Sequence, residues 1–231
     1  MCCYLYAAFG LRSELSDGLP PDQTDAVKRW RDTILAIAVE EMSHLALVSN
    51  LMVALGAHPH LGRQNMPVPP GYHPADIRLA LAPFDRQTLD HFIFLERPEG
   101  SGVADAASFA AGTHYVRETA AGRFFPAGSD YETIGGLYRD LAAALTKLEG
   151  KLGERLLFSG DPALQVGPET VSLPGLITIG NLVEAAQAVD NIVRQGEGAP
   201  GHDEHSHYGR LCQSDGRSSA LGAARADSSG D

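Results

Sequence analysis

The chain has 231 residues, of which 44% are hydrophobic and 20% are charged, so it can bury one sizeable core and we expect a single folded domain. Its formal net charge is −11 at pH 7, and so acidic a surface repels phosphate backbones and anionic lipids, which argues against nucleic acid and membranes as partners. The three cysteines include the adjacent pair Cys2 and Cys3 and do not suggest a disulfide framework, so we expect a cytoplasmic protein.

The first quarter of the chain predicts two helices. The apolar stretch MCCYLYAAFGLRSEL has no positively charged leader and is shorter than a membrane span, so we interpret it as a helix. After the turn-rich SDGLPPDQTD, a long helix is expected from about Thr24 to Leu55, ended by Gly56. Its apolar residues recur at spacings typical of a helix face: Trp30, Ile34, Ile37, Val48, Leu51 and Leu55.

Three further helices are expected, joined by long irregular segments. The helix FDRQTLDHFIFLER at 84–97 follows a segment rich in Pro and Gly and is ended by Pro98. The sequence at 130–158 predicts a helix with the apolar stripe Ile134, Leu137, Leu141, Leu145, Leu148 and Leu152. The sequence at 176–198 predicts the last helix, through Leu182, Ala186, Val189 and Val193. The pattern therefore predicts an all-α domain over residues 1–211 with four principal helices, followed at 212–231 by a tail too polar to fold.

Glu41 and His44 interrupt the apolar face of the long helix. Both keep the spacing of three and four residues, so their side chains point where the leucines point, whereas Glu40 lies about 100° round the helix and is expected to be solvated. A carboxylate that faces a core is costly unless it is paired or binds a metal. Glu-x-x-His on a bundle helix is the spacing used by di-iron and di-manganese carboxylate proteins, and a buried Glu–His hydrogen bond explains the pair as well.

Five segments of the sequence occur in an order that resembles a known family. They are YLYAAFGL, EEMSHLALVSNLMVALGAHPHLGR, FIFLERPEG, TIGGLY and IVRQGEG…SHYGRL. Together they resemble the ferritin-like domain family of iminophenyl-pyruvate dimer synthase, found in bacterial violacein-type pathways, over roughly residues 1–211. The resemblance implies a ferritin-like four-helix bundle with long crossover loops. It also implies an iron-dependent oxidoreductase of secondary metabolism, with manganese as the other candidate metal, that acts on a small aromatic or amino-acid-derived substrate.

The resemblance also implies a set of metal ligands, which fall on Glu41, His44, Glu197 and His207. Two further carboxylates that it implies are missing from this sequence. One would lie a few residues before Met1, as if the start of the chain were assigned too late, and the other falls on Gly136, because IGELY here reads IGGLY. We therefore expect at most one well-held iron or manganese ion per chain.

Two other acidic residues are second-choice ligands. Glu132 lies one helical turn before Gly136, and Glu204 forms a second Glu-x-x-His with His207. Glu96, at the end of a predicted helix, is interpreted as a buried structural carboxylate paired with Arg97 or a backbone amide, and His91 carries no spacing signal.

Two functions stay open from the sequence. The first is the iron-dependent oxidoreductase, with a small-molecule substrate and with catalytic residues that the sequence does not identify. The second is a non-catalytic binding or structural bundle whose metal site has decayed. Iron storage in a shell is disfavoured by the long irregular crossovers, and a homo-oligomer stays open.

Overall fold

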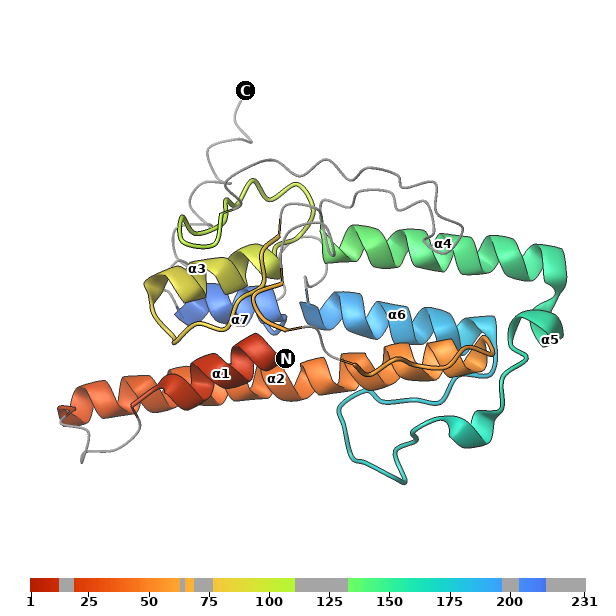
Figure 1. Ribbon diagram of the computed structural model, residues 1–231, viewed down its shortest axis with the longest axis horizontal. Helices are drawn as coiled ribbons and strands as arrows, with labels where there is room; N and C mark the ends of the chain where they lie inside the picture. The colour runs from red at the N-terminus through yellow and green to blue at the C-terminus, as the bar shows by residue number, and fades with distance from the viewer. Residues whose placement is uncertain (13–18, 63–64, 69–76, 111–132, 197–203, 215–231) are drawn as a thin grey trace.

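We describe the protein from a computed structural model, in residues 1–12, 19–62, 65–68, 77–110, 133–196 and 204–214 (Figure 1). Across these ranges every named secondary-structure element is helical, and one isolated β-bridge joins Val68 to Leu79. The expectation of an all-α fold is confirmed.

The longest helix, α2 (Pro21–Ala54), runs the length of the molecule, and the other helices lie along it. It begins directly after Pro20 and ends before Gly56, whose φ of 77° favours glycine. Of its predicted stripe, Ile34, Ile37 and Leu51 are buried, while Trp30 is at the edge and packs on Phe84. By length and composition alone α2 is apolar enough to cross a membrane, a property that core helices of bundles share.

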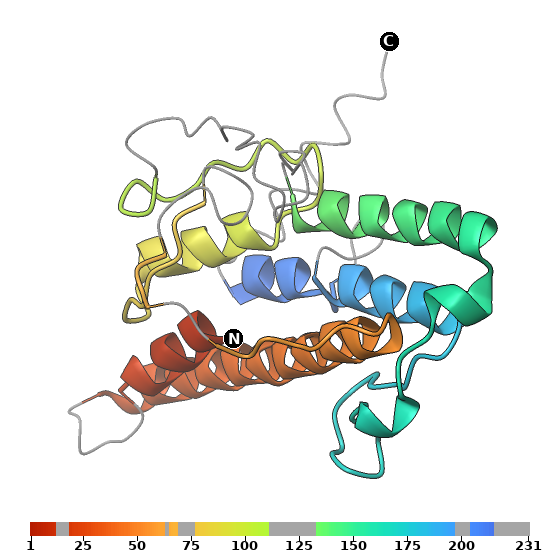
Figure 2. The same ribbon diagram turned by 45° about the vertical axis from the view of Figure 1, so that its right-hand side comes forward.

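The remaining helices form two groups above α2 (Figures 1 and 2). Over its N-terminal half lie α1 (Cys2–Gly10), α3 (Arg86–Leu95) and α7 (His207–Ser214). Over its C-terminal half lie α4 (Ile134–Leu152) and α6 (Leu182–Gly196), with the short α5 (Glu154–Leu157) beyond them. Both views show α7 continuing the line of α6 along α2.

Two apolar clusters follow from this division, and both include residues of α2. The first gathers α1, α3 and α7 around Ile34, Ile37 and Ala38. The second gathers α4 and α6 around Leu47 and Leu51. The turns of α2 between Ala38 and Leu47 carry polar residues that are wholly or partly buried, so a polar layer separates the two clusters.

Three elements differ from the sequence predictions. The expected helix at 130–158 is divided into α4 and α5 at Gly153, whose φ is 78°. The predicted apolar stripe of α4 is only partly buried, because this helix packs chiefly on α6. Leu145 is buried, whereas four other residues of the stripe are between 37% and 48% exposed: Ile134, Leu137, Leu148 and Leu152. On α6 the buried face runs through Ala185, Ala188, Val189 and Ile192, and Ala186 is exposed.

Helix α7 was not expected, because its sequence HYGRLCQS is short and polar. It buries Leu211 and Cys212 against α1, α2 and α3. The helical structure thus extends to Ser214, and residues 215–231 of the predicted tail lie outside the described residues.

A long connection, residues 158–181, is fastened to α2 by buried polar contacts. The side chain of Asn50, 1% exposed, donates to the carbonyl oxygens of Val166 and Ile177 and accepts from the amide of Val166. The amide of Gly160 donates to the carbonyl of Ala54 over 3.0 Å. These bonds give an irregular segment a fixed path beside the helix.

Candidate metal centre

The polar layer brings together side chains from four helices. Glu40, Glu41 and His44 come from the middle of α2, and His207 is the first residue of α7. Glu96 caps the C-terminus of α3, and Gln195 lies in the last turn of α6. His44 is 7% exposed and His207 is fully buried.

The two histidines turn the same ring nitrogen toward one carboxylate oxygen. Nδ1 of His44 lies 3.0 Å from Oε1 of Glu41, and Nδ1 of His207 lies 3.5 Å from the same atom. The other ring nitrogen of each histidine contacts a different oxygen. Nε2 of His44 is 2.8 Å from Oε1 of Gln195, and Nε2 of His207 is 2.7 Å from Oε2 of Glu40. An outer oxygen that accepts the Nε2 proton leaves Nδ1 as the ligating atom, which is how metal-binding histidines are commonly oriented.

Glu40 is not the solvated neighbour that the helix projection suggested. Its carboxylate accepts from Nε2 of His207 and also from the guanidinium of Arg210 on α7, and its side chain is 21% exposed. The projection was wrong because α7 covers this flank of α2, so the buried arc of the helix is wider than the apolar stripe. Glu40 thereby joins α2 to α7 and orients His207.

The charges in the layer shift several pKa values. Burial acts to raise the pKa of Glu41, but the hydrogen bond from His44 and the nearby positive charges lower it to about 2. Burial acts to lower the pKa of His207, but the hydrogen bond to Glu40 and the nearby carboxylates of Glu96 and Glu41 raise it to about 9. The pKa of Glu40 is also lowered, because the bonds from His207 and Arg210 outweigh its burial. The metal-free layer is thus held together by ionised groups.

Comparison with known proteins gives a family for the whole helical part. A family model described as ferritin-like matches residues 1–213. The chain belongs to the ferritin-like family. No curated protein and no solved structure matches it.

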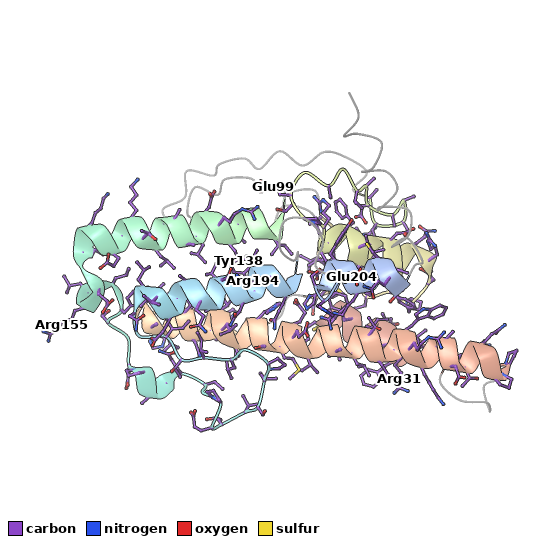
Figure 3. The ribbon with its side chains drawn as sticks, turned by 180° about the vertical axis from the view of Figure 1, so that it is seen from behind. Arg31, Glu99, Tyr138, Arg155, Arg194 and Glu204 are labelled. Carbon is purple, nitrogen blue, oxygen red and sulfur yellow. The ribbon has the colours of Figure 1, made fainter. Side chains whose placement is uncertain are left out.

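Three of the residues predicted for the ferritin-like site, Glu41, His44 and His207, lie together in the structure. One ligand atom from each lies within 4.8 Å of the other two. Glu197 and Glu132 lie outside the described residues, and their roles stay predictions. Glu204, labelled beside α7 in Figure 3, is exposed on the turn before this helix and is not part of this group. Within the described part of the chain, a Cβ on Gly136 would meet Oγ1 of Thr133 and no other atom within 4 Å.

The residues present fit a divalent metal ion. Two imidazole nitrogens and one carboxylate form the donor set that non-haem Fe(II) proteins use, and Mn(II) accepts the same atoms. Nδ1 of His207 is buried and has no well-formed hydrogen bond to any residue that the structure describes. A metal ion at this point would give that nitrogen a partner.

Sequence reasoning did not place three members of the layer at the site, Glu40, Gln195 and Glu96, nor Tyr4 of α1, whose hydroxyl contacts Glu96. For Glu96 a signal was present, because Leu89, Phe92 and Glu96 keep the helix spacing of three and four residues on the buried face of α3. Its expected partners were wrong, since the carboxylate accepts a hydrogen bond from Tyr4. Gln195 and Tyr4 carry no such signal, because their roles depend on how α6 and α1 pack.

Proposed function

We propose that this ferritin-like protein binds one divalent iron ion, with manganese as the alternative, through Glu41, His44 and His207. We further propose that it is an oxidoreductase for a small aromatic or amino-acid-derived metabolite. The observation that carries the metal site is the convergence of two Nδ1 atoms on Oε1 of Glu41, each with its Nε2 engaged by an outer oxygen. The substrate class rests on the ordered segments that resemble iminophenyl-pyruvate dimer synthase.

The residues around the site orient the proposed ligands in the metal-free protein. Glu40 and Gln195 fix the planes of the two imidazole rings, so the ligand atoms need little reorganisation on binding. The apolar clusters on either side limit the access of water to the layer. Bound iron supplies redox chemistry and a Lewis-acid centre to such a site.

Metal analysis of the purified protein tests the binding site. The protein is loaded with Fe(II) without oxygen, freed of excess metal and analysed beside Glu41→Ala. We expect close to one iron per chain in the parent protein. The variant should lose most of this iron, because Oε1 of Glu41 is the atom that both histidines face. Glu169→Ala is the matched control, since Glu169 is an exposed carboxylate outside the layer. Two tightly bound ions per chain would contradict the single-site proposal.

The activity is tested separately from the binding. Loaded protein is mixed with aromatic 2-imino acids generated in solution, and oxygen consumption and products are followed. Turnover that requires iron and is lost in Glu41→Ala supports the oxidoreductase.

A non-catalytic bundle with a decayed metal site is the second candidate. It is favoured by Gly136, where the resemblance implies a carboxylate and the sequence has no side chain. Folded protein that takes up neither iron nor manganese would establish it over the first candidate.

A further inference from the structure

The carboxylate of Glu96 also faces the candidate metal centre. Its Oε2 lies 3.5 Å from Nδ1 of His207, the same distance that separates this nitrogen from Oε1 of Glu41. Nδ1 of His207 is therefore placed between two carboxylate oxygens that come from different helices, α2 and α3. We infer that Glu96 is a fourth ligand of the metal ion and that Tyr4 is its positioning residue, an inference that rests on the proposed metal site.

The hydrogen bond from Tyr4 selects which oxygen of Glu96 is free. The Tyr4 hydroxyl donates to Oε1 of Glu96 over 2.6 Å, so Oε2 is the atom left to face His207. Both side chains are buried, at 3% and 8% exposure. The ring of Tyr4 is itself held against Phe92 of α3, with ring centroids 4.4 Å apart. The carboxylate consequently has little freedom to turn away.

Burial of Glu96 requires a positive partner, because an ionised carboxylate removed from water is costly. Among the residues that the structure describes, His207 is the basic group within 4.0 Å of it. Tyr4 donates a hydrogen bond but carries no positive charge. Glu40 and Glu41 have further positive partners, in Arg210 and in the amino group of Met1, whereas Glu96 has His207 alone within the described residues. A divalent cation between Glu41 and Glu96 gives the buried carboxylate of Glu96 a second positive partner.

The end of α6 lies directly beside this carboxylate. A Cβ on Gly196 would lie 3.4 Å from Oε2 of Glu96, within van der Waals contact. The resulting donor set has two imidazole nitrogens and two carboxylate oxygens, which suits Fe(II), Mn(II) and Co(II).

Titration of the full chain with Co(II) tests both roles, since this ion reports its coordination through its visible absorption. We expect Glu96→Gln to weaken Co(II) binding by about 100-fold or more and Tyr4→Phe by about 10-fold, the range for loss of a ligand or its support. Both variants should alter the absorption bands of the bound ion. Glu99→Gln is the matched control: the same charge is removed three residues later, from an exposed side chain that pairs with Arg139. Its affinity should stay within about twofold of the parent.

The outcomes separate this inference from the proposed function. If the parent protein binds Co(II) and Glu96→Gln binds it equally with an unchanged spectrum, Glu96 is not a ligand and the three-residue site still stands. If the parent binds no metal ion, the proposed site itself fails. If Glu96→Gln does not fold, Glu96→Asp keeps the charge but shortens the reach, and unaltered binding by that variant overturns the inference. Unaltered binding by folded Tyr4→Phe overturns the positioning role.

Discussion

At the scale of single residues, His207 is the side chain that faces three carboxylates of the candidate metal centre. It contacts Glu40 through Nε2, and through Nδ1 it faces Glu41 and Glu96. An apolar side chain cannot pair with these three carboxylates, so His207 links α2, α3 and α7 through polar contacts. A metal ion at Nδ1 takes the place of a proton there, while Nε2 keeps its bond to Glu40.

Tyr138 gives a pH-dependent prediction at this scale. Burial, and then the negative charge of Glu41, raise the pKa of this phenol from 10.0 to about 12. The phenol is partly buried in the cluster formed by α4 and α6, and Figure 3 shows it between these helices. Because the folded-state pKa lies above the unfolded one, the contribution to stability is complete below pH 10 and is lost as the pH rises through about 12.

An ultraviolet titration of phenolate in the metal-free protein measures this shift. We expect the difference between the parent and Tyr138→Phe to show one phenol that ionises near pH 12. In Glu41→Gln its midpoint should move down, because a nearby negative charge has been removed. A midpoint near 10 in protein that circular dichroism shows to be helical would contradict the prediction.

The residues of the candidate metal centre show which parts of the site can be predicted from sequence and which cannot. Glu41 and His44 were predictable because both lie on one face of one helix, and local spacing fixes that face. His207 was predicted as a ligand from the resemblance to the iminophenyl-pyruvate dimer synthase family. Gln195 and Tyr4 were not predictable, because nothing local places the end of α6 beside His44 or α1 beside α3. Such placements depend on tertiary packing between segments far apart in the chain.

At the scale of elements, α2 was predicted almost to its ends because its apolar periodicity is long and its flanking Pro and Gly residues are strong signals. Helix α7 was missed because eight mostly polar residues carry no periodicity of their own. It is stabilised instead by Leu211 and Cys212 in the core and by the contact of Arg210 with Glu40. The element that supplies His207 is therefore the one that depends most on tertiary contacts.

The contact between α2 and the connection at 158–181 gives a stability prediction. A Cβ on Gly160 would lie 1.7 Å from the carbonyl oxygen of Val53, which is backbone and cannot move aside cheaply. We expect Gly160→Ala to lower the free energy of unfolding by about 1–3 kcal/mol. Gly150→Ala on α4 is the control, because a Cβ there meets nothing within 4 Å and should add about 0.5–1 kcal/mol. Denaturant unfolding of the two variants measures both, and equal stability would show that the contact is not this close.

At the scale of the whole molecule, the polar layer joins two apolar clusters that both include α2 and that are also linked where α6 contacts α7. Its proposed ligands come from α2, α3 and α7, which are distant in sequence. The unfolded chain cannot gather them, so a metal ion held by them would bind the folded state almost exclusively and stabilise it.

Thermal unfolding tests this coupling. With free Mn(II) at about 100 times its dissociation constant, linkage predicts about 2.7 kcal/mol of added stability, or roughly 5–10 °C in Tm for a chain of this size. A chelator should reverse the shift, and Glu41→Ala should show none of it. A shift of the same size in that variant would mean that the ion binds elsewhere.

The position of the first residue has a practical consequence. The amino group of Met1 lies 3.7 Å from Oε2 of Glu41, at the start of the nine-residue helix that carries Tyr4. Any residues joined ahead of Met1, in a tag or in a longer chain, therefore lie beside the carboxylate that both histidines face. A tag at the C-terminus keeps its own atoms away from this contact.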